Sequence, residues 1–306
     1  MLPSLGRGIL LWCWVAAAAA QCLDHIAIGS WNTKHLGRAN FSYQDASILL
    51  ANLDLIALQE VNTTSAGAQA LRNLQQAVGQ LTHDKWCSII SPVPTDARER
   101  YAFLWRERAI ALASNEAEVK SAECPQAAEL AVLQPNKAAE IIREPAGAYF
   151  YAKDDQRFLY LASIHLVPTA KKPEREVPFL AQSMATQVAQ DKIPGLMAMV
   201  AGDFNLASSH TAFAPWAAAG WQAALPGTVK TSLQQKQKAF SKAYDNVWWW
   251  DAERGCQMFY QVINPYQVFP TKSPPEVYRE ISDHAPIMIR YHQRPSNSVA
   301  EEMGRD

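Results

Sequence analysis

Short apolar segments rich in β-forming residues recur along the chain, and this pattern limits the possible folds more than any other feature of the sequence. Each segment has the length of one strand and is bounded by polar residues. The predicted strands are residues 23–30, 54–61, 86–91, 100–106, 109–113, 148–152, 158–166, 196–201, 244–250 and 285–291. The predicted helices are residues 43–53, 66–81 and 177–190. Because strands outnumber helices and alternate with them, the pattern predicts an α/β (α+β) domain with sheets inside and helices outside.

The length and the charge of the chain narrow its class. A chain of 306 residues with 49% hydrophobic residues can bury a large core without a metal or a disulfide. Its formal net charge is −1, which argues against a strongly basic nucleic-acid coat protein. This balance leaves open an enzyme that contacts nucleic acid through a local basic rim.

Residues 1–20 have the features of a signal peptide. Arg7 is the only charged residue before Asp24, and an apolar run over residues 9–20 ends in three alanines. We predict cleavage after Ala20 and a secreted or periplasmic protein. An uncleaved anchor is the alternative.

The remainder of the chain is predicted to be one domain over residues 21–293, followed by a flexible polar tail over residues 294–306. No segment after the signal peptide is long and apolar enough to cross a membrane. We therefore expect no contact with a membrane.

Four cysteines remain once the signal peptide is removed. They are Cys22, Cys87, Cys124 and Cys256. An even number in an exported chain predicts one or two disulfides, and four cysteines allow three complete pairings. Their wide spacing does not match a zinc site. Free buried thiols are one alternative, and a lipidated Cys22 is another.

Polar residues stand at the predicted strand ends, which is where ligand sites gather in α/β proteins. These residues are Asn32, Glu60, His165, Asp203, Asn205, Asp245, Asp283 and His284. Any one of them alone is more often a turn former or a helix cap. Together, the carboxylates and amides provide the hard oxygen ligands that Mg²⁺, Mn²⁺ or Ca²⁺ prefer, and the histidines can act as general acid and base. The set predicts metal-assisted hydrolysis of a phosphodiester.

Eight short blocks give these residues a family context. They are Trp31-Asn32, Gln59-Glu60-Val61, Arg98-Glu99-Arg100-Tyr101, Arg143-Glu144-Pro145, Ser163-Ile164-His165, Gly202-Asp203-Phe204-Asn205, Ala243-Tyr244-Asp245 and Ser282-Asp283-His284-Ala285-Pro286. The blocks resemble the endonuclease/exonuclease/phosphatase superfamily, and most closely its deoxyribonuclease I branch. The resemblance implies a four-layered α/β sandwich with two central, mainly antiparallel sheets flanked by helices.

The resemblance also implies a role for each residue of the site. His284, oriented by Asp245, would be the general base. His165, paired with Glu99, would be the general acid. Asn205 would orient phosphate oxygens and the attacking water. The implied metal ligands are Glu60, Asp203, Asp283 and Asn32, and the implied phosphate or substrate contacts are Arg143, Asn32, Asn62 and Tyr101.

The implied activity is a metal-dependent endonuclease that cuts DNA, in the first place double-stranded, and leaves 5′-phosphate and 3′-hydroxyl ends. The implied cofactor is Mg²⁺ or Mn²⁺, with Ca²⁺ as a further candidate. We expect a monomer with no obligate protein partner. Three other interpretations stay open. They are a sphingomyelinase or phosphoinositide phosphatase of the same superfamily, a nuclease subunit similar to that of cytolethal distending toxin, and a binding module without activity.

Two positions depart from the deoxyribonuclease I pattern. Where that branch has an arginine and a tyrosine in the minor groove of DNA, this chain has Asn62 and Ala97. The cysteine that would close the branch's small disulfide loop with Cys124 is absent. Basic residues in loops could compensate for the lost groove contacts, namely Arg98, Arg100, Lys171, Lys172 and Arg175. The run Trp248-Trp249-Trp250 is predicted to pack in the core rather than to stack on bases.

Overall fold

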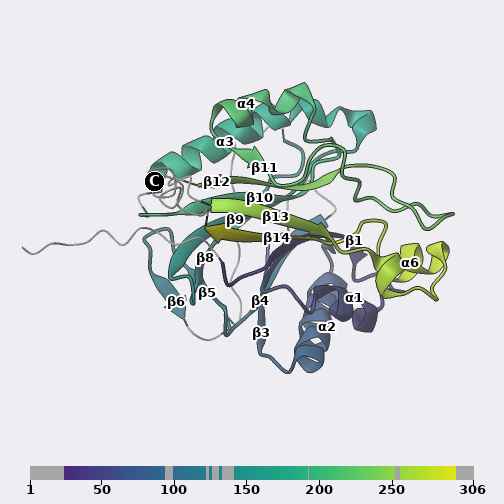
Figure 1. The fold of residues 1–306 in the computed structure, drawn as a ribbon. Coiled ribbons are helices and arrows are strands. Elements are labelled where there is room, and N and C mark those ends of the chain that lie inside the picture. The colour runs from purple at the N-terminus through teal and green to yellow at the C-terminus, as the bar shows by residue number, and fades with distance from the viewer. Residues whose placement is uncertain are drawn as a thin grey trace, which may run out of the picture.

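The structure is a computed structural model, and it describes residues 24–93, 99–121, 124–125, 131–132, 141–191, 193–251 and 256–293. The predicted signal peptide (1–20), the predicted tail (294–306), Cys22, Ala97 and Arg98 lie outside these residues. The described residues form two β-sheets stacked on each other, with helices on both outer sides (Figure 1).

The first sheet has six strands, in the order β13-β14-β1-β2-β4-β3. Its strands are β1 (Ile28–Leu36), β2 (Leu55–Asn62), β3 (Trp86–Ile90), β4 (Glu99–Arg106), β13 (Cys256–Val262) and β14 (Ile287–Gln293). β1 and β2 are parallel, and the other neighbouring strands are antiparallel. The edge strand β13 was not predicted from the sequence, because most of its side chains face solvent and it lacks the apolar run of a buried strand.

The second sheet has eight strands, of which β7 pairs with β8 and the rest follow the order β11-β12-β10-β9-β8-β5-β6. Its strands are β5 (Ile110–Ala113), β6 (Val119–Ser121), β7 (Ala131–Val132), β8 (Ala146–Ala152), β9 (Arg157–His165), β10 (Met197–Asp203), β11 (Gln222–Ala223) and β12 (Asp245–Asp251). β9 and β10 are parallel, and the other neighbours are antiparallel. The prediction of mainly antiparallel sheets is confirmed.

Helices cover the outer faces of both sheets, with α1 and α2 on the first and α3 and α4 on the second (Figure 1). The α-helices are α1 (Tyr43–Leu50), α2 (Ser65–Thr82), α3 (Val177–Gln190), α4 (Ala214–Ala218), α5 (Pro265–Val268) and α6 (Pro274–Glu280), and the 3₁₀ helices are η2 (Thr169–Lys171), η3 (Pro173–Arg175) and η4 (Thr211–Phe213). α2 buries Leu71, Leu74 and Val78, whereas Leu81 in its last turn is 45% exposed. Among the described residues, no helix combines the length and apolarity needed to cross a membrane.

Three apolar clusters fill the three spaces between these layers. Along β2, Leu55 and Ala57 belong to the cluster between the sheets, while Ile56 and Leu58 belong to the cluster under α1 and α2. This alternation follows from the two-residue period of a strand. The third cluster lies between the second sheet and the helices α3 and α4 and includes Trp216. The layers are helix, sheet, sheet and helix, so the predicted four-layered sandwich is confirmed.

The three consecutive tryptophans pack inside the protein, as predicted. Trp248 stacks on Phe213 with ring centroids 4.7 Å apart, on the side of the sheet that faces α4. Trp249 points to the opposite side, where its ring meets the edge of Tyr291 at 5.5 Å. Trp250 packs against the same cluster as Trp248.

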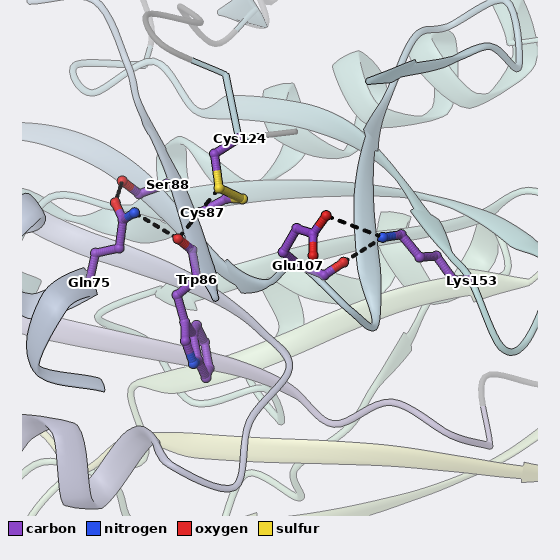
Figure 2. Close-up of a disulfide and its surroundings, with 7 residues drawn as sticks. All are labelled: Gln75, Trp86, Cys87, Ser88, Glu107, Cys124 and Lys153. Atoms are coloured by element: carbon purple, nitrogen blue, oxygen red, sulfur yellow. Dashed lines mark hydrogen bonds and ion pairs between the residues drawn. A yellow bond between two sulfur atoms is a disulfide. The ribbon is translucent and has the colours of Figure 1, made fainter. Parts of the chain in front are cut away.

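A disulfide joins Cys87 of β3 to Cys124, which lies 37 residues later in the chain (Figure 2). The prediction of at least one disulfide is confirmed, and Cys124 has a partner that the family resemblance did not imply. The Trp86 carbonyl lies 3.5 Å from the Cys124 sulfur and accepts a 2.7 Å hydrogen bond from Gln75 of α2. The disulfide therefore attaches Cys124 to the β3 edge of the first sheet.

Two strands extend farther toward the candidate site than the apolar pattern predicts. β1 continues through Asn32 to Leu36, and β2 continues through Glu60 to Asn62. Asn32 therefore lies within its strand rather than after it, and Glu60 lies inside β2, as the predicted strand over residues 54–61 implied. In both strands the pairing register shifts at these positions, and polar side chains there hide the strand signal.

Candidate active site

The second sheet brings three predicted site residues to one end of the sandwich. His165 is the last residue of β9, Asp203 is the last of β10, and Asp245 is the first of β12. The register of β10 pairs Asp203 with His165 on one side and with Asp245 on the other. Three residues that are far apart in the sequence thus become neighbours because their strands share one register.

The first sheet contributes Asn32, Glu60 and Glu99 to the same end. Glu60 lies where the pairing of β2 with β4 shifts between Leu58 and Val61, and its backbone φ is 58°. This left-handed conformation is uncommon for a residue other than glycine, and such irregularities re-aim a side chain. The Glu60 side chain is 14% exposed, and its two oxygens lie 3.8 Å from His165 Nδ1 and 3.2 Å from His35 Nδ1.

The amide of Asn32 connects the two sheets. Its Nδ2 donates to Glu60 Oε1 at 2.9 Å and to Asp203 Oδ2 at 3.1 Å. A second bridge between the sheets runs from Gln59 Nε2 to Ser163 Oγ at 2.8 Å, and both residues are fully buried. These bonds hold a carboxylate of the first sheet close to a carboxylate of the second.

His165 lies buried between two carboxylates. Its Nδ1 is 2.6 Å from Glu99 Oε1, and its Nε2 is 3.5 Å from Asp203 Oδ2. Burial lowers the pKa of His165, but the hydrogen bond to Glu99 and the charges of Asp203 and Glu99 outweigh it, so the pKa is raised. The imidazole is therefore suited to hold a proton and to give it to a leaving group.

His284 forms a second pair in the segment before β14. Its Nδ1 is 2.7 Å from Asp245 Oδ2, which also accepts a 2.6 Å hydrogen bond from the Thr231 hydroxyl. Burial lowers the pKa of His284, but the charges of Asp245 and Asp203 outweigh it and raise the pKa well above its usual value. Burial also raises the pKa of Asp245, against the effect of His284. The pair has a high affinity for a proton while the nearby negative charge is not neutralised.

One oxygen, Oδ2 of Asp203, is the point toward which these groups converge. The Nε2 atoms of His165 and His284 lie 3.5 and 3.6 Å from it, and the Asn32 amide donates to it. Each imidazole has its Nδ1 held by another carboxylate, so Nε2 is the nitrogen that faces the centre. A small charged group bound beside Asp203 would be within reach of both histidines.

Asn205 is held next to this centre. Its backbone has φ 50°, its N–H donates to Asp203 Oδ1 at 2.8 Å, and its side-chain Nδ2 donates to the Leu166 carbonyl at 3.0 Å. Asparagine tolerates the left-handed conformation better than most residues. The turn after β10 therefore places an amide of fixed orientation beside the carboxylate.

The residues at the centre fit a hard divalent cation. Among the residues that the structure describes, two groups have ligand atoms within 4.8 Å of one another: Glu60, Glu99 and His165, and Asp203, Asp245 and His284. Asp283 Oδ1 and Asp245 Oδ1 are buried and have no hydrogen-bond partner among the described residues. A buried carboxylate oxygen without a partner is costly, and a cation relieves this cost. An oxygen-rich site suits Mg²⁺, Mn²⁺ or Ca²⁺.

Arg143, a predicted phosphate contact, lies at the rim of this centre. Its Nε is 3.6 Å from Glu99 Oε1, and its Nη1 donates to the Leu166 carbonyl at 3.0 Å. Its side chain is 21% exposed. This partial exposure leaves N–H donors available for an anion.

Two other predicted substrate contacts make internal hydrogen bonds. Tyr101 is buried, and its hydroxyl accepts the backbone N–H of His165 at 3.1 Å, so it positions the end of β9. Asn62 Oδ1 accepts from both the N–H and the hydroxyl of Thr64 at 2.9 Å, so its amide shapes the turn into α2. Contact of either residue with a substrate stays a prediction.

Arg38 is a residue of the site that sequence reasoning missed. Its guanidinium donates to the carbonyls of Thr33 and Ile281, each at 2.6 Å, to that of Arg279 at 3.3 Å, and to that of Lys34. The carbonyls belong to two segments, one directly after the Asn32 amide and one directly before the Asp-His pair. Arg38 thus ties both segments together. No short motif marks an arginine whose partners are backbone carbonyls.

Comparisons with known proteins agree with this geometry. Residues 29–284 match the model of the Endonuclease/Exonuclease/phosphatase family. A protein named deoxyribonuclease from Thioalkalivibrio sp. (strain K90mix) is 24% identical over 253 residues. The matched region covers 81% of this chain and 64% of that relative, so this chain spans less than two thirds of the relative's length.

Solved structures share the fold. D. rerio TDP2 complexed with a single-strand DNA product has a TM-score of 0.56 at 15% identity, covering 88% of this chain and 99% of its own. The mannosyl-6-phosphatase Bt3783 of Bacteroides thetaiotaomicron VPI-5482 has a TM-score of 0.58 at 14% identity, covering 87% of this chain and 99% of its own. With the family match over most of its length, the chain belongs to the endonuclease/exonuclease/phosphatase family of hydrolases.

Proposed function

We propose that the protein is a divalent-metal-dependent phosphodiesterase that cuts within DNA strands and leaves 5′-phosphate and 3′-hydroxyl ends. The position of two imidazoles around Asp203 supports this most strongly, because both Nε2 atoms lie within 3.6 Å of one carboxylate oxygen. A phosphodiester placed beside Asp203 has one imidazole for its nucleophile and another for its leaving group. Such a pair can act as base and acid in a single turnover.

Each imidazole has one role in this proposal. His284 is the general base: Asp245 holds its Nδ1, so that Nε2 can take a proton from the attacking water. His165 is the general acid: Glu99 holds its Nδ1, so that Nε2 can give a proton to the leaving 3′ oxygen. The hydrogen bond to Glu99 and then the charge of Asp203 raise the pKa of His165, and the charges of Asp245 and then Asp203 raise that of His284. Neutralising Asp203 would lower both pKa values and so favour the unprotonated form of His284 that a general base needs.

The surrounding residues bind the reacting groups. The residues that would hold the cation are Glu60, Asp203, Asp283 and Asn32. When bound, Mg²⁺ or Mn²⁺ supplies positive charge to the phosphate oxygens, and Ca²⁺ is a further candidate. Arg143 and Asn205 donate hydrogen bonds to the same oxygens, for which a guanidinium is well shaped. Asn62 and Tyr101 stay candidates for substrate contacts.

The relatives favour DNA as the substrate. The curated relative is named a deoxyribonuclease, and the TDP2 structure contains a single-strand DNA product. The mannosyl-6-phosphatase has the same fold, so a phosphatase or a phosphodiesterase acting on a small or lipid substrate is the alternative. The arginine-containing blocks around Glu99 and Arg143 resemble nucleases and favour DNA over that alternative.

We also propose that the protein is secreted or periplasmic and acts without an obligate partner chain. The disulfide between Cys87 and Cys124 supports export, since disulfides persist mainly in oxidising compartments.

Plasmid cleavage tests the proposed function. Purified protein with Mg²⁺ or Mn²⁺ is expected to convert supercoiled plasmid to nicked circles, and a chelator is expected to stop the reaction. DNA ligase should reseal the nicks without prior kinase treatment, because the ends carry a 5′-phosphate and a 3′-hydroxyl.

A parallel substrate panel separates the alternatives. Release of phosphate or phosphocholine from a sugar phosphate, a phosphoinositide or sphingomyelin, without nicking of plasmid, would contradict the DNA assignment. Digestion of linear DNA from its ends, with circular DNA left intact, would contradict cleavage within the strand.

A further inference from the structure

A lysine-rich hairpin stands beside the site and has no role in the chemistry proposed above. Residues 227–243 contain no acidic residue and four exposed lysines, which are Lys230, Lys236, Lys238 and Lys242. Backbone hydrogen bonds from Gln234 N to Ala239 O at 2.9 Å and from Ser241 N to Ser232 O at 2.8 Å form the antiparallel hairpin. We call residues 230–242 the basic hairpin.

The base of the basic hairpin is attached to the catalytic residues. The Thr231 hydroxyl donates to Asp245 Oδ2 at 2.6 Å, and the Thr231 carbonyl accepts from Ala285 N at 3.0 Å. Leu233 N donates to the Asp283 carbonyl at 2.6 Å. The hairpin is therefore fixed to the segment that carries Asp245 and to the segment that carries His284. These bonds set its position relative to the reacting groups.

The outer part of the basic hairpin, from Leu233 onward, is also anchored. Leu233 is buried and Phe240 is partly buried in the apolar cluster under the first sheet. The Tyr266 hydroxyl donates to the Gln234 carbonyl at 3.0 Å, and Lys238 Nζ donates to the Pro270 carbonyl at 2.6 Å. These contacts hold the backbone against the α5–α6 segment, while the lysine side chains remain exposed.

A pocket of about 450 Å³ opens between the basic hairpin and α6, and we call it the basic pocket. Its lining includes Lys34, Arg38, Asn40, Gln235, Tyr278 and Arg279. Lys34 Nζ lies 3.0 Å from the centre of the Tyr278 ring. The Lys34 backbone N–H donates to Asn32 Oδ1 at 3.0 Å, and the Asn32 amide in turn donates to Glu60 and Asp203. The basic pocket therefore adjoins the residues that would hold the metal, and Gln235 makes it continuous with the hairpin.

The basic hairpin carries charge of one sign. In the neighbouring α6 region the positive charges are paired: Lys272 lies 3.0 and 2.8 Å from Asp45 and Glu280, and Arg279, which lines the basic pocket, is also paired with Glu280. The basic hairpin contributes four positive charges and no carboxylate of its own sequence. A series of like charges on an anchored element, leading away from a site for phosphoryl chemistry, matches a polyanion with regularly spaced phosphates.

We propose that the basic hairpin and the basic pocket together bind the phosphates that flank the cleaved bond in a polynucleotide. This proposal rests on the proposed function and adds to it a reason for choosing polymers over small phosphate esters. A small diester fills only the centre around Asp203 and gains nothing from the lysines. A polynucleotide places further phosphates along them and binds more tightly.

Two double variants of equal charge test the proposal. The first is Lys236→Gln/Lys242→Gln, which leaves Lys238 in place because Lys238 holds the tip of the hairpin. The control is Arg72→Gln/Lys85→Gln, in which both residues are exposed. Lys85 precedes β3, whose first residue pairs with the end of β4 farthest from the site.

The hairpin variant is expected to raise the KM for plasmid about tenfold, since each lost phosphate contact weakens binding uniformly. The slope of log(kcat/KM) against log[NaCl] should become shallower by about 1 to 2, because fewer counterions are released on binding. Hydrolysis of bis(p-nitrophenyl) phosphate, a diester without flanking phosphates, should stay unchanged. The control variant should match the unmodified protein in all three measurements.

Four outcomes would overturn this inference. An unchanged salt slope in the hairpin variant is one, and an equal change in the control is another. A parallel loss of small-diester hydrolysis is the third, because it would mean that the substitutions disturb the centre itself. Melting temperatures and the single variant Lys230→Gln check for such a disturbance. Loss of binding to anionic vesicles with unchanged plasmid cleavage would identify a lipid-binding face instead. If the unmodified protein cleaves a sugar phosphate but no plasmid, the proposed function itself has failed, and that result is distinct from the others.

Discussion

Asp203 occupies the centre of the site at the scale of single residues. One of its oxygens faces both imidazoles and the Asn32 amide, and the other accepts the Asn205 N–H at 2.8 Å. The imidazoles are themselves held by Glu99 and Asp245. Because every neighbour has a fixing partner of its own, the polar groups are already oriented before a substrate arrives, which is the arrangement that favours charge stabilisation in a transition state.

The two histidines should differ in their response to the leaving group. His165→Ala and His284→Ala are each expected to lower the rate of plasmid nicking about 10²- to 10⁴-fold while the fold is retained. A substrate with a good leaving group, such as a 3′-phosphorothiolate, should restore activity to His165→Ala but not to His284→Ala, because only the general acid becomes unnecessary. His292→Ala, on an exposed histidine of β14, is the matched control. A rate near that of the unmodified protein in either variant, or rescue of both, contradicts the assigned roles.

Arg38 should affect the cation more than the chemistry. Arg38→Ala removes the donor for carbonyls of two segments and is expected to lower the free energy of unfolding by about 1–3 kcal/mol. The Mg²⁺ concentration for half-maximal activity should also rise, because those segments carry Asn32 and Asp283. Arg38→Lys should not restore the original Mg²⁺ requirement, since an ammonium cannot span the same set of carbonyls. Stability loss with an unchanged Mg²⁺ requirement would show a structural role only, and Arg72→Ala is the control.

At the scale of elements, the site depends on close contact between β9 and β10. Gly202, just before Asp203, has φ +154°, and a Cβ added there would lie 1.9 Å from the Ile164 carbonyl oxygen. Only glycine allows β10 to approach β9 in this way, which gives a physical reason for the first residue of the Gly-Asp-Phe-Asn block. A slip of one residue in this register would turn Asp203 to the opposite face of the sheet.

The disulfide lies at the other end of the first sheet and should affect stability rather than activity. Cys87 of β3 pairs with Trp105 near the end of β4, whereas Glu99 begins that strand at the site. Closing a loop of 37 residues stabilises a fold by about 2–4 kcal/mol. Cys87→Ser/Cys124→Ser should therefore melt at a lower temperature and nick plasmid at an unchanged rate at 25 °C. A loss of nicking under conditions where the variant is fully folded would contradict this separation.

At the scale of the whole molecule, the site exists only when the two sheets are stacked. Asn32 joins Glu60 of the first sheet to Asp203 of the second, and Gln59 joins Ser163 beneath them. This arrangement gathers several negative charges in a buried space. This negative charge, together with the hydrogen bonds to Glu99 and Asp245, raises the pKa of both histidines against the effect of burial.

Stability should therefore depend jointly on pH and metal. The folded protein raises the pKa of both His165 and His284, so their contribution to stability is complete below about pH 6.5 and is lost as the pH rises through the folded-state pKa values. In the presence of a chelator, the melting temperature of the unmodified protein should fall as the pH rises above about 6.5. The melting temperature of the variant His165→Ala/His284→Ala should fall less over the same pH range. Mg²⁺ should raise the melting temperature more at pH 8.5 than at pH 6, because protons then compete less with the cation. An equal shift at both pH values would contradict this, and Glu60→Gln/Asp203→Asn should abolish the shift.

The sequence by itself determined the fold class and the identity of the residues at the centre. Strand and helix periods are set by neighbouring residues, so most elements could be predicted to within a few positions. Blocks such as Gly202-Asp203-Phe204-Asn205 could be assigned to strand ends because an apolar run stops directly before them. β13 was not predicted, because most of its side chains are exposed and the sequence there lacks the apolar run of a buried strand.

Only the tertiary structure decided how these residues meet. No local sequence pattern predicts four features of the structure. They are the left-handed backbone of Glu60, the hydrogen bonds of Arg38 to two segments, the disulfide between Cys87 and Cys124, and the position of the basic hairpin beside Asp245. Each depends on contacts between residues that are distant in the sequence. Their geometry follows from the register of the strands and the stacking of the sheets, and a local pattern encodes neither.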